Sequence, residues 1–171
     1  MIHKIIHIGV YSMQEISQPL PLAKAKNVRD LGGYRTNTGD ITKKGAFLRG
    51  DALCCLTDED CHLLYEYGVR CVIDLRSREE IRRAPDALHS RYPQIEYVSV
   101  PIQDHVRANR YSCEFPPSMW ELYCWLLDDS GESFRAIWEA ILRYPADCVL
   151  FHCTGGKDRT GMVAMLLLLL A

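Results

Sequence analysis

Residues 152–161 of this chain read His-Cys-Thr-Gly-Gly-Lys-Asp-Arg-Thr-Gly, between two apolar stretches. The preceding residues 148–151, Cys-Val-Leu-Phe, predict a buried strand, and the aliphatic residues 162–170 predict a buried helix. A strand, a glycine-containing loop and a helix start form a site for phosphate. The N–H groups of such a loop point inward, and the helix N-terminus carries partial positive charge. The run therefore predicts a phosphate-binding loop.

A cysteine and an arginine in this loop indicate its chemistry. Cys153 opens the loop, where the field of the N–H groups favours thiolate over thiol and makes the sulfur a nucleophile. Arg159 closes the loop, and its planar guanidinium can hold two oxygens of a phosphoryl group. The pair predicts hydrolysis of a phosphate ester through a phosphocysteine. The alternative is a structural turn with a buried cysteine, but such a turn does not need three charged residues at 157–159.

Composition sets the class of protein. The chain has 171 residues, 48% of them hydrophobic, which predicts one globular domain over residues 1–171. The net charge of −2 and the lack of a basic stripe argue against a nucleic-acid partner. No signal peptide is recognisable and the leucine run is too short to span a bilayer, so we expect a cytoplasmic protein without a transmembrane segment. The eight cysteines lack metal-ligand spacing, and we expect reduced thiols and no metal.

Strand and helix signals alternate along the chain. Strands are predicted near residues 46–49, 69–75, 95–100 and 148–151, and an edge strand is predicted within residues 1–8. Capping residues open helices after Thr57, Ser77 and Ser118. The order predicts an α/β fold with a central, mainly parallel sheet flanked by helices. Ligands of such sheets bind beyond the carboxyl ends of the strands, where Cys153 falls.

Four segments carry a family resemblance. They are Asn-Val-Arg-Asp-Leu-Gly-Gly-Tyr at 27–34, Phe-Leu-Arg-Gly-Asp-Ala-Leu at 47–53, Val-Ile-Asp-Leu-Arg-Ser at 72–77, and the loop at 152–159. With them the chain resembles the cysteine-dependent protein-tyrosine phosphatase superfamily, and within it the atypical bacterial PtpB-like tyrosine and lipid phosphatases. Members of this group continue well past the helix that follows the loop. We therefore expect the domain to lack its C-terminal helices.

The resemblance implies a fold and an activity. It implies a protein-tyrosine-phosphatase-like fold and an enzyme that hydrolyses phosphotyrosine in proteins, with phosphoserine, phosphothreonine and phosphoinositides as further candidate substrates. No metal or organic cofactor is implied, because the arginine and the loop dipoles supply the positive charge. The residues implied to bind the substrate phosphate are Thr154, Gly155, Gly156, Lys157, Asp158 and Arg159.

Three residues around the loop have two interpretations each. His152 is predicted to orient the loop by hydrogen bonds to backbone, or to be a buried histidine with satisfied partners. Thr160 either donates a hydrogen bond to the Cys153 sulfur or caps backbone groups at the helix start. Lys157 either adds positive charge to the rim of the pocket or is a solvated lysine.

The leaving group needs a proton, and three carboxyl groups are candidates for the general acid. Asp104 lies in a long loop after the strand at 95–100, which resembles the acid loop of the superfamily. Asp158 lies inside the phosphate loop, as the proposed acid does in myotubularin-like enzymes. Asp74 ends a strand whose carboxyl edge faces the site, although it is also placed to form a structural ion pair with Arg76.

Two other functions compete with a phosphatase. One is a non-catalytic phosphate-binding module on the same fold, but a binding module has little need of the thiol. The other is a rhodanese-like sulfurtransferase, which also uses a loop cysteine. Arg159 followed by Thr160 favours phosphate over sulfane sulfur. The sequence alone does not distinguish phosphotyrosine from a lipid headgroup, because it does not give the depth of the pocket.

Overall fold

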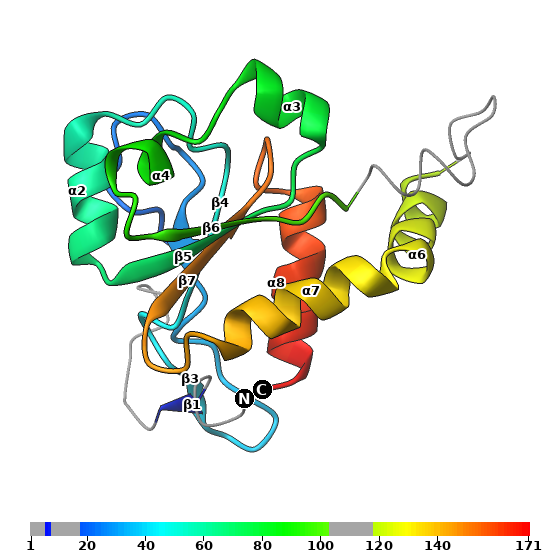
Figure 1. The fold of residues 1–171 in the computed structure, drawn as a ribbon. Coiled ribbons are helices and arrows are strands. Elements are labelled where there is room, and N and C mark those ends of the chain that lie inside the picture. Colours follow the sequence, from blue (N-terminus) through cyan, green and yellow to red (C-terminus); the bar gives the residue numbers. More distant parts are fainter. Residues whose placement is uncertain (1–5, 8–17, 103–117) are drawn as a thin grey trace.

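A computed structural model describes residues 6–7, 18–102 and 118–171 of the chain. Its central feature is a five-stranded sheet with the strand order β2-β4-β7-β5-β6 (Figure 1). The strands are β2 (Arg29–Asp30), β4 (Phe47–Gly50), β5 (Val69–Asp74), β6 (Glu96–Ser99) and β7 (Cys148–His152). Only β2 is antiparallel to its neighbour. The predicted mainly parallel sheet is therefore confirmed.

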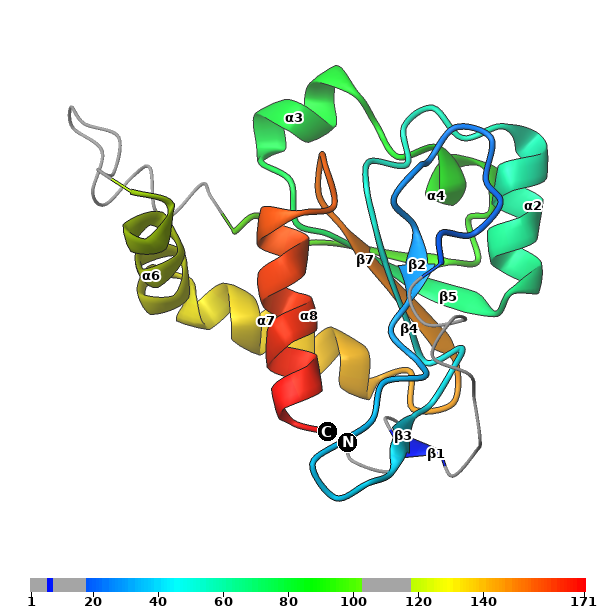
Figure 2. The same ribbon diagram turned by 180° about the vertical axis from the view of Figure 1, so that it is seen from behind.

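Helices cover both faces of this sheet (Figures 1 and 2). The helices are α2 (Asp58–Glu66), α3 (Arg78–Arg83), α4 (Ala87–Arg91), α6 (Met119–Asp129), α7 (Gly131–Leu142) and α8 (Asp158–Leu169). One face packs against α7 and α8, and the other against α2 and α4. A smaller antiparallel sheet pairs β1 (Ile6–His7) with β3 (Ile41–Thr42), so the predicted N-terminal strand lies outside the main sheet.

The apolar residues of the strands explain the two layers. In β7, Leu150 packs into the core under α2 and α4, whereas its neighbour Phe151 packs into the core under α7 and α8. Successive side chains of a strand point to opposite faces, so a continuous apolar run fits a strand that is covered on both sides. Both side chains are fully buried. This confirms the buried strand predicted just before the phosphate loop.

Two predicted helix starts are confirmed in detail. The side chain of Thr57 accepts a hydrogen bond from the Asp60 N–H, and the Asp60 carboxylate accepts one from the Thr57 N–H. Ser77 and Glu80 form the same reciprocal pair at the start of α3. Such caps satisfy N–H groups that have no partner inside the helix.

Helix α8 differs from the prediction of a helix buried on every side. Val163 and Leu167 are buried against the sheet, but Met165 and Leu169 are exposed, Leu169 to 75%. The helix packs on the sheet through one face, and these two exposed side chains lie outside that contact (Figure 2).

Candidate active site

The phosphate loop lies between the central strand and the last described helix. β7 has a parallel neighbour on each side and ends at His152, and α8 begins at Asp158. The loop thus stands at the carboxyl edge of the sheet, as predicted. Gly156 has a φ of +66°, and a Cβ there would come within 2.6 Å of the Gly50 carbonyl oxygen. A side chain at this position would both strain the backbone and clash, so the tight turn requires glycine.

Three carbonyl groups of the loop accept hydrogen bonds from residues outside the loop. The Gly155 carbonyl accepts a 2.9 Å hydrogen bond from Asn27 Nδ2, and the Gly156 carbonyl accepts one of 2.7 Å from Arg49 Nη2. The Thr154 carbonyl accepts a bond from the Ala52 N–H. In a trans peptide the C=O and the N–H point in opposite directions, so outward carbonyls favour N–H groups that face the interior of the loop. This is the arrangement of an anion-binding nest.

Cys153 is the first residue of the loop and is only 3% exposed. Two guanidinium groups, those of Arg49 and Arg159, lie close enough for its charge to raise their pKa values. Burial is the larger effect on Arg49 and lowers its pKa overall. The surroundings of the sulfur are therefore electropositive.

Arg159 lies in the first turn of α8 and folds back over the loop. Its Nη1 and Nη2 atoms donate to the two Glu80 carboxylate oxygens at 2.8 and 2.9 Å. Burial alone would lower its pKa, but the bonds to Glu80 and the charge of Cys153 raise it. The remaining contacts, to the Leu75 carbonyl and the Thr154 hydroxyl, are long at 3.4 Å. A guanidinium has five N–H donors, and these four bonds start from Nη1 and Nη2, so Nε–H remains for a phosphate oxygen.

Glu80 has a role that sequence analysis did not assign to it. The carboxylate caps α3, pairs with Arg159 and accepts a hydrogen bond from the Thr154 hydroxyl. The Arg159 bonds, with smaller contributions from Thr154 and Ser77, hold the Glu80 pKa far below its usual value. Glu80 is therefore ionised, and it fixes the orientation of Arg159. The capping-box signal was visible in the sequence, but it accounts for only part of what this side chain does.

His152 is fully buried beneath the loop. Its Nδ1 lies 3.2 Å from the Cys153 carbonyl oxygen, so it donates to backbone as predicted. Its Nε2 lies 3.6 Å from carboxylate oxygens of both Asp74 and Asp86. Burial raises the pKa of Asp86, although the charge of His152 opposes this effect. Asp86 was not predicted, and it also caps α4, a short helix that the sequence analysis missed.

Asp74 forms an ion pair with Arg76, which was one of the two roles predicted for it. It accepts bonds from Arg76 Nε and Nη2, and a 2.7 Å bond from the Tyr97 hydroxyl. Burial alone would raise the Asp74 pKa, but the bonds from Arg76, the charge of His152 and the Tyr97 bond lower it overall. A group with a lowered pKa is ionised near neutral pH, which is unfavourable for a general acid. Asp74 thus has a structural role, because it contacts both Arg76 and His152, the residue just before the loop cysteine.

The remaining predicted site residues differ in their exposure and in their hydrogen bonds. Lys157 and Asp158 are exposed, and Asp158 accepts a 2.5 Å bond from the Tyr123 hydroxyl. The Thr160 hydroxyl is fully buried and has no hydrogen-bond partner within the described residues, so neither bond expected for it is formed there. Asp104 lies outside the described residues.

The described residues hold no group of three His, Cys, Asp or Glu side chains that could bind a metal ion. In the same part of the chain, none of the helices combines the length and apolar character needed to cross a membrane.

The loop and the sheet place the chain in the cysteine-based phosphatase superfamily. The model of a family described as "Tyrosine phosphatase family" matches residues 20–171, and the chain belongs to that family. It is 38% identical over 128 residues to a tyrosine-protein phosphatase of Nostoc commune, covering 74% of this chain and 43% of the relative. A protein of Cupriavidus necator, provisionally named a tyrosine-protein phosphatase, is 29% identical over 149 residues, or 83% of this chain and 54% of the relative.

The chain therefore spans about half the length of the curated relatives that it matches. Among solved structures, it is similar to a kinase-associated phosphatase whose catalytic cysteine was replaced by serine. The TM-score is 0.48 at 18% identity, and the match covers 90% of this chain and 76% of the other.

Proposed function

We propose that this chain hydrolyses phosphotyrosine in proteins through a phosphocysteine formed on Cys153. The observation that carries the proposal is the closed phosphate loop, in which Cys153 and the Glu80-anchored Arg159 stand at the carboxyl edge of the central strand. Family membership supports it. A phosphate-binding module without catalysis would bind its ligand without the thiol, so the cysteine in this electropositive position favours the enzyme.

The reaction has two steps. In the first, the Cys153 thiolate attacks phosphorus, a P–S bond forms, and the P–O bond to the leaving phenolate breaks as a general acid gives that oxygen its proton. In the second, water attacks the phosphocysteine and gives a proton to the now ionised general acid, the P–S bond breaks, and inorganic phosphate and the thiolate are released. Arg159 and the inward N–H groups stabilise the charge on the phosphoryl oxygens in both steps, with no cofactor.

Turnover of para-nitrophenyl phosphate is the direct test of this function. We expect hydrolysis that vanadate inhibits competitively, because vanadate occupies the same loop as the transferring phosphoryl group. Phosphotyrosine peptides are expected to be hydrolysed as well. A chain that binds vanadate but turns over neither substrate would be the binding module instead.

The general acid is a separate prediction, and Asp104 and Asp158 are its candidates. Removing the acid slows the release of a poor leaving group far more than that of a good one, because a good leaving group departs without a proton. We expect Asp104→Asn to lower kcat on phenyl phosphate by about 10²-fold or more and kcat on an activated aryl phosphate much less. The alkaline limb of the pH–rate profile is expected to flatten.

Two variants accompany this measurement. Asp158→Asn tests the alternative acid, and Asp128→Asn, at an exposed position of α6, is the matched control that we expect to leave both rates unchanged. If Asp158→Asn shows the leaving-group dependence and Asp104→Asn does not, the acid lies inside the phosphate loop. Equal slowing of both substrates by Asp104→Asn would mean that Asp104 affects the site without transferring the proton.

A further inference from the structure

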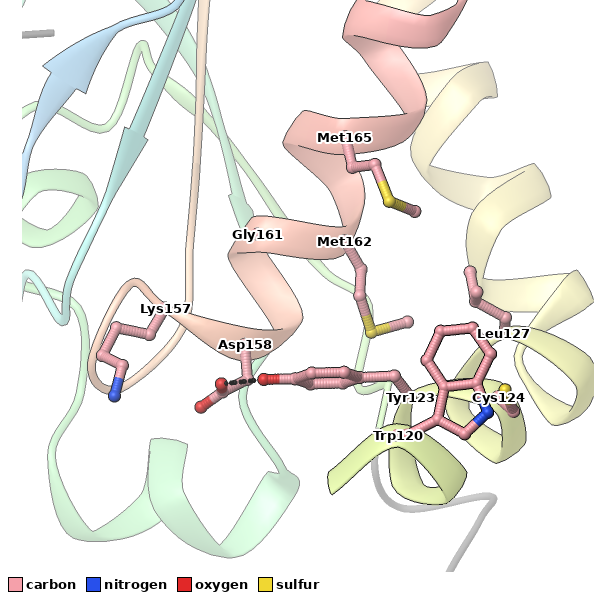
Figure 3. A pocket seen from close by; sticks show the side chains of 9 residues that line it. All are labelled: Trp120, Tyr123, Cys124, Leu127, Lys157, Asp158, Gly161, Met162 and Met165. Atoms are coloured by element: carbon pink, nitrogen blue, oxygen red, sulfur yellow. Dashed lines mark hydrogen bonds between the residues drawn. The ribbon is translucent and has the colours of Figure 1, made fainter. Parts of the chain in front are cut away.

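A cavity of about 310 Å³ lies between α6 and α8, beside the phosphate loop (Figure 3). Its walls are almost entirely apolar. Met162 and Met165 line it from α8, and Trp120, Tyr123 and Leu127 line it from α6. Methionine side chains adapt to ligands of different shape, and aromatic rings provide large rigid contact surfaces. The cavity is thus suited to an apolar group.

The cavity and the phosphate loop share residues. Lys157 and Asp158 belong to both, and the Tyr123 hydroxyl donates a 2.5 Å bond to Asp158, so the tyrosine ring bridges from α6 to the start of α8 (Figure 3). A group bound in the cavity would lie next to a phosphoryl group bound in the loop. The two places are therefore close enough for one substrate molecule to reach both.

The α6 side of the cavity is exposed. Trp120 is 74% exposed although it is the largest apolar side chain of the lining. Leaving apolar surface in water is unfavourable by about 25 cal/mol per Å². Exposed apolar surface next to a polar site often marks a binding surface. A ligand with an apolar part would cover this side chain.

We propose that this cavity, named here the α6–α8 subsite, binds an apolar side chain of the substrate protein that is close in sequence to the phosphotyrosine. The proposal rests on the function proposed above. Two features favour a peptide over a phosphoinositide. Among the described residues, the rim carries one cation, Lys157, and one anion, Asp158, whereas a lipid headgroup with further phosphates is bound by clusters of cations. The volume is at the lower end for ligand pockets, about 300–1,000 Å³, which suits one large side chain.

Peptide binding to the Cys153→Ser variant tests the subsite without turnover. Two sets of phosphotyrosine peptides are compared, which differ only in having leucine or alanine at one of the three positions on either side of the phosphotyrosine. We expect leucine at one position to tighten binding about tenfold, because a leucine buried there leaves water. The added substitution Trp120→Ala is expected to reduce that preference to about twofold or less. Met119→Ala, at an exposed residue of α6 outside the cavity lining, is the matched control and should retain the full preference.

The outcomes separate this inference from the proposed function. Equal binding of the leucine and alanine peptides at every position, or a preference that survives Trp120→Ala, would overturn the subsite. Vesicles containing phosphatidylinositol phosphates that bind in a Trp120-dependent manner, with no peptide preference, would overturn its assignment to a peptide. If the preference is found but the wild-type chain does not hydrolyse the same peptides, the subsite stands and the proposed function fails.

Discussion

Replacing Cys153 with serine is expected to lower kcat on para-nitrophenyl phosphate by about 10⁴-fold or more, the scale seen when a catalytic nucleophile is removed. A serine hydroxyl stays protonated at neutral pH and is a much weaker nucleophile than a thiolate. The bonds that hold the loop and Arg159 do not involve the sulfur, so we expect both to keep their places in this variant. Phosphate and vanadate should therefore still bind, and calorimetry measures that binding directly.

Cys55→Ser is the matched control for this result. Cys55 is an exposed free thiol outside the phosphate loop, so its replacement should leave both kcat and KM unchanged. A Cys153→Ser variant that retains wild-type turnover would exclude the phosphocysteine mechanism. Loss of phosphate binding together with turnover would instead show that the sulfur is needed to hold the shape of the loop.

Replacing Arg159 with alanine is expected to lower kcat by about 10³ to 10⁵-fold, as does loss of an arginine that stabilises a transferring phosphoryl group. Two effects combine here. The guanidinium donors to the phosphate oxygens are lost, and the Glu80 carboxylate loses its partner and becomes an unpaired negative charge beside the phosphate. Steady-state kinetics on para-nitrophenyl phosphate measures both kcat and KM.

Two further variants show whether geometry or charge matters at this position. Arg159→Lys keeps the charge without the planar fork, so it should recover only a small part of the lost rate. Arg83→Ala removes an exposed arginine of α3 and should leave the rate unchanged. If Arg159→Ala raised KM and left kcat intact, Arg159 would bind the substrate without stabilising the transition state.

The phosphate loop could be predicted because its signals are local. A buried strand, glycines and a helix start follow one another within residues 148–170, and each element is visible in the sequence on its own. The same holds for the caps of α2 and α3, where a polar residue and its partner are three positions apart. The residues of such a short-range pattern stay neighbours in the folded chain, so the pattern indicates the local structure directly.

The residues that hold the loop could not be predicted, because their partners are distant in the sequence. Glu80 lies 79 positions from Arg159, Arg49 lies 107 from Gly156, and Asn27 lies 128 from Gly155. Only the folded sheet brings them to one edge. Arg49 and Asn27 fell within segments that carried the family resemblance, but nothing in those segments told which carbonyl each side chain would bind.

Helix α4 and the exposed face of α8 show two further limits of prediction from the sequence. A signal for α4 is present in Asp86, but the helix has only five residues and begins two positions after Pro85, a residue that typically ends a helix. The run of leucines in α8 indicated burial on every side. Composition alone does not tell which face of an apolar helix meets the sheet, and Leu169 is exposed.

The most direct test of the phosphocysteine is to trap it. Mixing the wild-type chain with a phosphotyrosine peptide, quenching with acid within the first turnover and measuring the mass of the intact protein should show one added phosphoryl group. Peptide mapping should place that group on Cys153, and the Cys153→Ser variant should show none. Release of phosphate in the first turnover without any phosphorylated protein, or a phosphoryl group on another residue, would contradict the mechanism.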